Sequence, residues 1–133
     1  MPAALITGGA GFVGSHLAEY LLHQGWHVTV LDNLSTGRLS NIQHLSSKSN
    51  LRVVIDDVRN AMIVDRYVSE CDVIIHLAAA VGVHKILNEP INTIETNIGG
   101  TETLLKAARR YRRKFMLAST SEVYGDPEIH PQT

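Results

Sequence analysis

The chain has 133 residues, a length typical of one domain, and 44% of them are apolar, which is enough to build a core. Lysine and arginine number 12 and aspartate and glutamate 13, so net charge gives no sign of an anionic partner. The sequence has neither a membrane-length apolar run nor a signal-peptide pattern, so we expect no membrane partner and a cytoplasmic protein. Cys71 is the single cysteine, which excludes an internal disulfide and a cysteine-rich metal site, and we expect no bound metal.

The first predicted elements are a strand over Ala3–Thr7, a helix that begins near Phe12, and a second strand over His27–Leu31. Both strands are short runs of mostly apolar residues, whereas the helix repeats its apolar residues at helical spacing. The apolar face of this helix consists of Phe12, Leu17, Leu21 and Leu22. Gly25 ends the helix.

The middle of the chain begins with a polar segment. Residues Ser35–Asn50, rich in serine, asparagine and glycine, predict a surface loop with one short helix at most. A strand over Leu51–Ile55, a helix over Ala61–Ser69 and a strand over Val73–His76 follow. Because His76 ends a strand, we expect it to be a packed or hydrogen-bonded side chain.

A third helix is predicted from about Asn92 to Arg110, with Pro90 just ahead of it, where a proline does least harm. Its predicted apolar side consists of Ile94, Ile98, Leu104, Leu105 and Ala108. The cationic cluster from Lys106 to Lys114 begins at the end of this helix, where cations stabilise the helix dipole, so we expect no nucleic-acid partner. A fifth strand follows over Phe115–Ala118.

Strands that alternate with helices and are apolar throughout predict a parallel sheet covered on both faces. Right-handed crossovers wind such a sheet outward from its first strand, which gives the order 3-2-1-4-5. We therefore predict an α/β fold with a doubly wound parallel sheet of the Rossmann type, in one domain over residues 1–133. Because no helix follows the fifth strand to cover the sheet edge, we expect this domain to be incomplete and the natural protein to continue.

The segment Thr7–Ser15 reads TGGAGFVGS and lies between the first strand and the first helix. Gly8 permits a tight turn, Gly11 lets a pyrophosphate approach the backbone, and Gly14 lets helix and strand pack closely. The start of the helix adds free N–H groups and a favourable dipole for an anion. We expect a dinucleotide to bind here, with Phe12 and Val13 among the residues that contact it.

Asp32 lies at the end of the second strand, where the dinucleotide-binding motif requires an acid. Its carboxylate can accept hydrogen bonds from both ribose hydroxyls, whereas a 2′-phosphate would meet like charge. The sequence therefore favours NAD over NADP as the cofactor. Arg38 lies nearby in sequence and can relieve part of that repulsion, so the preference is not absolute.

With these features in place, the chain resembles the extended short-chain dehydrogenase/reductase family that modifies nucleotide sugars. Five segments carry the resemblance, in the family's order and over nearly the whole chain. They are Thr7–Ser15, Leu31–Leu34, Asp56–Arg59, His76–Ala79 and Ala118–Gly125.

The resemblance implies roles for individual residues around NAD. Asp32 and Asn33 belong to the segment that binds the ribose, and Asp57 and Val58 would hold the adenine. The turn after the fourth strand would line the dinucleotide cleft with Leu77, Ala78 and Ala79. Asn97 matches an asparagine that helps to position the nicotinamide side of the cofactor.

Two residues after the fifth strand are the catalytic candidates that the resemblance implies. Thr120 would hydrogen-bond the hydroxyl at sugar C4, and Glu122 would act as an acid or base near C5. The family also uses a Tyr-x-x-x-Lys pair to remove the C4 hydroxyl proton, but no tyrosine here has a lysine four positions later. The motif would fall beyond Thr133, so we expect this chain to be inactive alone.

The implied parent is an NAD-dependent epimerase, dehydratase or decarboxylase that passes through a transient 4-keto sugar. The run Ser119–Glu122 looks like UDP-glucuronate decarboxylases, whereas Ala79–His84 looks more like epimerases. Sugar 4,6-dehydratases usually carry an aspartate where Ser121 stands here. We place a UDP-sugar 4-epimerase first, with UDP-glucuronate decarboxylase or 4,6-dehydratase as the alternative, and expect a nucleotide-sugar partner and a full-length homodimer. A dinucleotide-binding module without catalysis is the alternative from another class.

Overall fold

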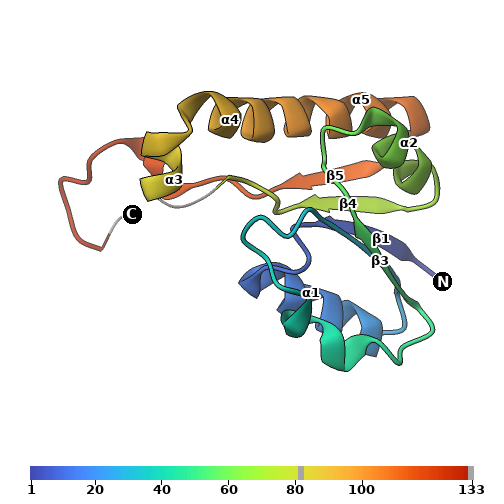
Figure 1. Ribbon diagram of the computed structural model, residues 1–133. Coiled ribbons are helices and arrows are strands. Elements are labelled where there is room, and N and C mark those ends of the chain that lie inside the picture. The colour runs from blue at the N-terminus through green and yellow to red at the C-terminus, as the bar shows by residue number, and fades with distance from the viewer. Residues whose placement is uncertain (81–82, 132–133) are drawn as a thin grey trace.

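The computed structural model describes residues 1–80 and 83–131 and contains a five-stranded parallel sheet (Figure 1). The strands are β1 (Ala3–Thr7), β2 (His27–Asp32), β3 (Leu51–Ile55), β4 (Val73–His76) and β5 (Lys114–Leu117). Their order in the sheet is β3-β2-β1-β4-β5, which confirms the predicted doubly wound topology. In this register Thr7, at the end of β1, is the partner of Leu31 in β2 and of His76 in β4.

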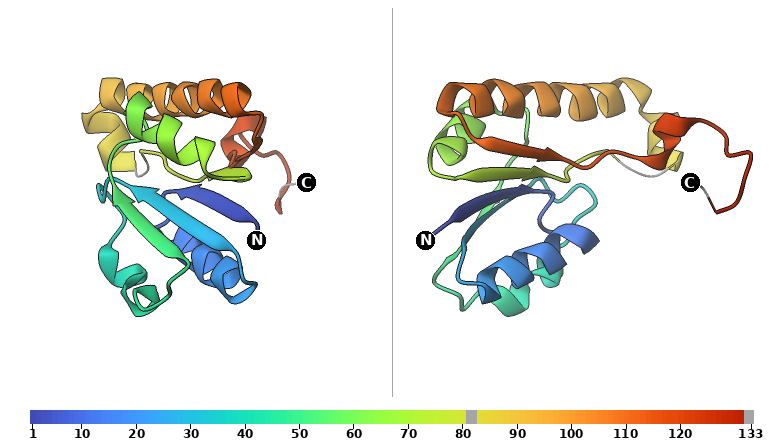
Figure 2. Two further views of the ribbon diagram at one scale, coloured as in Figure 1. Left: turned by 90° about the vertical axis from the view of Figure 1, so that its right-hand side faces the viewer. Right: turned by 180° about the vertical axis from the view of Figure 1, so that it is seen from behind.

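Helices cover both faces of the sheet (Figure 2). One face carries α1 (Phe12–His23) together with the 3-10 turns η1 (Leu39–Asn41) and η2 (Gln43–Leu45). The other carries α2 (Ala61–Ser69) and α5 (Gly100–Tyr111). Each face has its own buried apolar cluster, so the alternating side chains of the central strands divide between two cores. Within the described ranges, no helix is both long and apolar enough to cross a bilayer.

The third predicted helix differs from the observed one. The structure has α3 (Val83–Asn88), which the sequence analysis did not predict, and then α4 (Pro90–Ile94), the π-helical turn η3 (Glu95–Gly99) and α5. Figure 1 shows α4 and α5 as one nearly continuous rod above β4 and β5.

The predicted apolar side of this rod was wrong in part. Ile94, Ile98 and Leu105 are exposed, whereas Leu104 and Ala108 are buried. Successive residues on a helix point about 100° apart, and Leu105 falls outside the face that Leu104 and Ala107 present to the sheet. The buried face consists of Gly100, Leu104, Ala107 and Ala108.

The first helix also departs from its predicted face at one residue. Leu21 and Leu22 are buried as expected and Leu17 packs against the same core, but the side chain of Phe12 is 79% exposed. Phe12 is the first residue of α1, and its ring lies against the exposed side chain of His16, with 4.8 Å between ring centroids, and not in the core. The segment Ser35–Asn50 contains the two 3-10 turns in place of the single short helix allowed for it.

Candidate functional site

A cavity of about 380 Å³ opens at the carboxyl ends of β1, β2 and β4. Its position is the one where doubly wound sheets bind their ligands, beside the point at which strand order reverses. The residues that line it are Gly8, Gly11, Phe12, Val13, Gly14, Leu31, Asp32, Asn33, Ser35, Thr36, Gly37, Asp56, Val58, Leu77, Ala78, Ala79 and Thr96. Eleven predicted site residues are therefore close together in the fold; Asp57, Asn97, Thr120 and Glu122 do not line the cavity.

The glycine-rich loop forms the floor of this cavity, and each glycine has little space for a side chain. Gly8 has a φ of +71°, and a Cβ there would lie 2.8 Å from the backbone nitrogen of Ala78. A Cβ on Gly14 would lie 2.2 Å from the carbonyl oxygen of Gly8, so only glycine lets α1 approach the loop this closely.

The start of α1 offers backbone donors to the cavity. Its N-cap is Gly11, which has no side chain to cap the first turn. The N–H groups of a helix's first turn lack partners within the helix, and the helix dipole favours negative charge beside them. An uncapped helix start that lines a cavity is suited to binding an anion.

Asp32 occupies the last position of β2 and is only 7% exposed. Its Oδ2 atom accepts a hydrogen bond from Ala10 N at 3.0 Å, and its Oδ1 atom accepts one from Leu34 N at 2.8 Å. Each carboxylate oxygen can still accept a further hydrogen bond from a ligand. A Cβ on Gly37 would lie 2.9 Å from Oδ2, so the loop after β2 is packed directly against this carboxylate.

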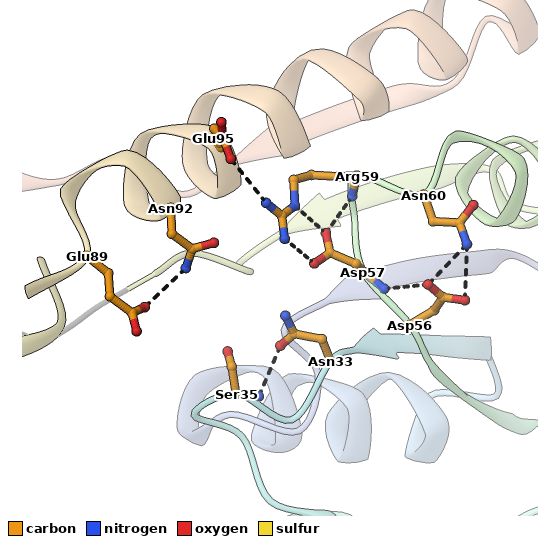
Figure 3. Close-up of polar contacts among 9 residues, drawn as sticks. All are labelled: Asn33, Ser35, Asp56, Asp57, Arg59, Asn60, Glu89, Asn92 and Glu95. Atoms are coloured by element: carbon orange, nitrogen blue, oxygen red, sulfur yellow. Dashed lines mark hydrogen bonds and ion pairs between the residues drawn. The ribbon is translucent and has the colours of Figure 1, made fainter.

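The two acids after β3 have different surroundings (Figure 3). Asp56 lines the cavity and accepts hydrogen bonds from Asn60 and from the backbone N–H of Asp57. The carboxylate of Asp57 instead pairs with Arg59, whose Nε and Nη2 atoms lie 2.9 and 2.8 Å from its two oxygens. The hydrogen bond from Arg59 is the main reason why the pKa of Asp57 lies below its usual value. Arg59 also reaches Glu95 of η3, at 3.9 Å.

The turn after β4 forms the wall of the cavity beside the glycine-rich loop, close to Gly8. Leu77 and Ala78 donate their backbone N–H groups to Thr7 Oγ1, each at 3.2 Å. Asn97 holds the far end of the turn, because its Oδ1 atom accepts a hydrogen bond from Ala80 N at 2.7 Å. Asn97 therefore lies behind the wall, whereas its neighbour Thr96 lines the cavity.

The two catalytic candidates lie apart from the cavity. Thr120 precedes the 3-10 turn η4 (Ser121–Tyr124), in the segment that leaves the sheet after β5 (Figure 2). Its Oγ1 atom accepts a hydrogen bond from the backbone N–H of Glu122 at 3.3 Å, and both residues are exposed. Both remain candidates on sequence grounds. Val81 and Gly82, part of the segment that favoured epimerases, lie outside the described residues.

Sequence reasoning missed six residues that line the cavity. They are Leu31, Ser35, Thr36, Gly37, Asp56 and Thr96. Ser35, Thr36 and Gly37 directly follow the ribose-binding segment, and a short glycine-containing loop at the end of a strand is a signal that would have identified them. Thr96 lies on η3, and nothing in the linear pattern reveals that a π-helical turn brings it to β4.

This geometry defines a class of protein. The doubly wound sheet, the glycine-rich loop leading into an uncapped helix, and the acid at the end of β2 together define a Rossmann domain. Comparisons with known proteins agree with the resemblance to the extended short-chain dehydrogenase/reductase family. The family model described as GDP-mannose 4,6 dehydratase matches residues 5–133, and the chain belongs to this family.

Three known proteins illustrate what the chain is similar to. UDP-glucuronic acid decarboxylase 1 of Xenopus tropicalis is 46% identical over 129 residues, covering 97% of this chain and 30% of the relative. The structure of UDP-N-acetylglucosamine 4-epimerase from Methanobrevibacter ruminantium has a TM-score of 0.89 and 30% identity over 99% of this chain and 42% of its own. That of dTDP-glucose 4,6-dehydratase from Streptomyces venezuelae, with NAD bound, has a TM-score of 0.89 and 35% identity over 96% of this chain and 42% of its own. The chain therefore spans less than half of each protein.

Proposed function

We propose that the cavity binds NAD and that this chain forms the cofactor-binding portion of a nucleotide-sugar-modifying enzyme. The observation that carries the proposal is the contact between Gly8 and Gly14, which leaves no space for a Cβ and brings the uncapped start of α1 to the cavity floor. A pyrophosphate fits such a floor because backbone N–H groups and the helix dipole both favour negative charge. The NAD in the dehydratase structure supports the choice of cofactor.

The roles of the individual residues follow from their positions. Gly8, Gly11, Phe12, Val13 and Gly14 would hold the pyrophosphate. Asp32 and Asn33 would bind the adenosine ribose, and an acidic side chain at position 32 would disfavour a 2′-phosphate. Val58 would pack against the adenine.

Five further residues complete the proposed cofactor site. Leu77, Ala78 and Ala79 would lie along the dinucleotide. Asp57 would hydrogen-bond the adenine through oxygen lone pairs that the Arg59 ion pair leaves free. Asn97 would help to position the nicotinamide indirectly, because it holds the turn after β4 through Ala80.

For the whole protein we propose chemistry at sugar C4. NAD, when bound, would supply the redox chemistry at that carbon as a hydride acceptor. The residues of this chain would orient the sugar and transfer a proton: Thr120 would hydrogen-bond the C4 hydroxyl, and Glu122 would act as an acid or base near C5. The Tyr-x-x-x-Lys pair of the family would have to come from a segment outside these 133 residues.

Three outcomes of this chemistry remain as candidates, and one of them, 4,6-dehydration, has support in the matching family model and in the dehydratase structure. The decarboxylase has support in the 46% identity to UDP-glucuronic acid decarboxylase 1 and in the run Ser119–Glu122. The UDP-sugar 4-epimerase that the sequence analysis places first has support in the structural likeness to an epimerase. We propose the decarboxylase as the first candidate, because the relative that supports it is closer in sequence.

We also propose that the longer protein is a homodimer. Ile94, Ile98 and Leu105 form an exposed apolar stripe along α4, η3 and α5. An apolar stripe of this kind is typical of a helix that packs against a partner. Sedimentation of the extended protein would reveal the oligomeric state.

The binding proposal is tested with two glycine variants. A Cβ on Gly11 would lie 3.2 Å from the carbonyl oxygen of Gly8, so Gly11→Ala should fold with a small adjustment but obstruct the pyrophosphate. Gly99→Ala is the control, because the nearest atom to its Cβ lies 4.0 Å away, on Arg59. Calorimetric titration with NAD should show at least about tenfold weaker binding for Gly11→Ala only, equivalent to about 1.4 kcal/mol. Equal NAD affinity in all three proteins would contradict the proposal.

The reaction is tested on a longer protein, whose sequence past residue 133 is read from the gene. With UDP-glucuronate, a decarboxylase releases carbon dioxide, whereas a 4-epimerase interconverts two UDP-hexoses without loss of carbon. A stop codon directly after residue 133 would instead favour the dinucleotide-binding module without catalysis.

A further inference from the structure

His76 is the last residue of β4 and is 3% exposed, with both ring nitrogens in hydrogen bonds. Its Nδ1 atom lies 2.6 Å from Thr7 Oγ1 at the end of β1, and its Nε2 atom lies 3.0 Å from Thr101 Oγ1 on α5. The expectation of a packed or hydrogen-bonded histidine is therefore confirmed. This side chain joins the strand that precedes the glycine-rich loop to the helix that follows η3.

The hydrogen bonds around Thr7 determine which ring nitrogen carries the proton. Thr7 Oγ1 accepts the backbone N–H of Ala78 at 3.2 Å and shares that of Leu77, which also donates to the carbonyl oxygen of Thr7 at 3.1 Å. The acceptor for the Thr7 hydroxyl hydrogen is His76 Nδ1, at 2.6 Å, so Nδ1 carries no proton.

The hydrogen bonds around Thr101 agree with this assignment. The Thr101 hydroxyl donates to the carbonyl oxygen of Asn97 at 2.7 Å, which leaves a lone pair to accept the Nε2–H of His76. The imidazole is therefore neutral and protonated at Nε2. Burial favours the neutral form, because it lowers the pKa of His76.

The turn Leu77–Ala80 depends on this chain of hydrogen bonds at both ends. Its start is held by Thr7, which His76 orients, and its end by Asn97, whose backbone oxygen receives the Thr101 hydroxyl. The turn is also packed directly against the glycine-rich loop, because a Cβ on Gly8 would come within 2.8 Å of Ala78 N. A shift of the turn would therefore change the width of the cavity directly.

We propose that His76 is a positioning residue for the dinucleotide: as the Nε2–H tautomer it orients Thr7 and Thr101 so that both ends of the turn Leu77–Ala80 are held against the glycine-rich loop. The inference rests on the proposed function, since the ligand whose binding it controls is NAD. His76 does not itself line the cavity, so it acts through the turn.

The tautomer can be tested without any ligand. Long-range ¹H–¹⁵N correlation spectra of the ligand-free, labelled chain distinguish a protonated from an unprotonated ring nitrogen. We expect Nδ1 of His76 to show the shift of an unprotonated nitrogen and Nε2 that of a protonated one near neutral pH. An Nδ1–H tautomer, or an imidazolium, would overturn the proposal.

The effect of His76 on NAD binding is tested with two variants that remove different numbers of its hydrogen bonds. His76→Asn keeps an acceptor at the position of Nδ1, whereas His76→Phe keeps an aromatic ring but removes both hydrogen bonds. We expect His76→Phe to bind NAD about tenfold more weakly and His76→Asn to recover most of this loss, because an unpaired buried hydroxyl or amide is costly. His27→Gln is the control, since His27 is exposed at the opposite end of β2.

The amide resonance of Ala78 separates positioning from a general loss of stability. We expect it to move in His76→Phe and to stay near its wild-type position in His76→Asn and His27→Gln. Equal NAD affinity in wild type and His76→Phe, or an unchanged Ala78 amide in that variant, would overturn the inference. If the wild-type chain binds no NAD, the proposed function fails, whereas the tautomer and the Ala78 amide still decide whether His76 holds the turn.

Discussion

The carboxylate of Asp32 accepts a hydrogen bond from the backbone N–H of Ala10, at 3.0 Å, across the gap between β2 and the glycine-rich loop. The second oxygen of the carboxylate accepts the N–H of Leu34, a residue with a φ of +60°. Asp32 therefore holds together two loops, the glycine-rich loop and the loop after β2, in addition to any contact with a ribose. An acid at this position stabilises the empty site as well as the proposed complex.

Replacement of Asp32 by asparagine should weaken both the fold and the choice of cofactor. The amide group has one oxygen, so its NH₂ must face the N–H of Ala10 or of Leu34 and leave a buried donor unpaired, at a cost of about 1–3 kcal/mol. Loss of the negative charge should also reduce the preference for NAD over NADP. Urea unfolding and titration with both dinucleotides measure the two effects. Asp126→Asn, a neutralised acid in the exposed segment after β5, should change neither.

The glycines of the first loop and of η3 should respond to alanine in opposite directions. A Cβ on Gly14 would lie 2.2 Å from Gly8 O and 2.7 Å from the Cα atom of Gly9, both backbone atoms that cannot turn away. We expect Gly14→Ala to lower the free energy of unfolding by about 1–3 kcal/mol or more. Gly99→Ala should raise it by about 0.5–1 kcal/mol, because alanine favours a helix. Equal midpoints of urea unfolding for the two variants would refute this packing argument.

The strands could be predicted well from the sequence because each is a short, mostly apolar run with polar residues or glycine close to its ends. Three of the five observed strands have the predicted bounds, and the sheet order follows from right-handed crossovers alone. The buried side of the rod formed by α4, η3 and α5 was harder to predict, because apolar residues occupy more than one of its faces. Local spacing finds an apolar stripe, but it does not tell which stripe faces the sheet and which, like Ile94 and Ile98, stays exposed.

The candidate site likewise contains residues that local sequence patterns predict and residues that they do not. The residues of the glycine-rich loop and Asp32 were predictable because their roles depend on local backbone geometry and on the end of one strand. Asp57 was assigned to the adenine by resemblance alone, and the pairing of its carboxylate with Arg59 could not be seen from spacing. Thr96 and Gly37 reach the cavity through long-range packing, which leaves no periodic pattern in the sequence.

The pairing of Asp57 with Arg59 should make stability depend on acid pH. The pKa of Asp57 is lower in the folded chain than its ordinary value, chiefly because Arg59 donates hydrogen bonds to it. A lowered folded-state pKa stabilises the fold above the unfolded pKa, and this stabilisation disappears as pH falls through the folded value. Arg59→Gln should raise the pKa of Asp57 and flatten that dependence, as measured by NMR titration and by unfolding between about pH 5 and 2.

A second arginine provides the control for this prediction. Arg52 pairs with Glu70 between β3 and the end of α2, on the exposed surface. Arg52→Gln removes the same charge without touching Asp57, so it should leave the Asp57 titration unchanged. If Arg59→Gln also leaves the Asp57 titration unchanged, the cause assigned to the shift is incorrect.

The thiol of Cys71 should report on opening of the second core. Cys71 is 4% exposed, packs in the cluster that contains Leu5 and Ile74, and has its pKa raised to about 11 by burial. At pH 8 only about one thiol in a thousand would be ionised even if reagent could reach it, because each pH unit below the pKa lowers the thiolate fraction tenfold. We expect the folded chain to resist a disulfide reagent that labels the chain rapidly in urea, with Cys71→Ser as the blank. The labelling rate should rise in Gly14→Ala about tenfold for each 1.4 kcal/mol of lost stability, because the thiol is exposed only when the chain unfolds. Rapid labelling of the native wild-type chain would mean that α2 and α5 leave the sheet without global unfolding.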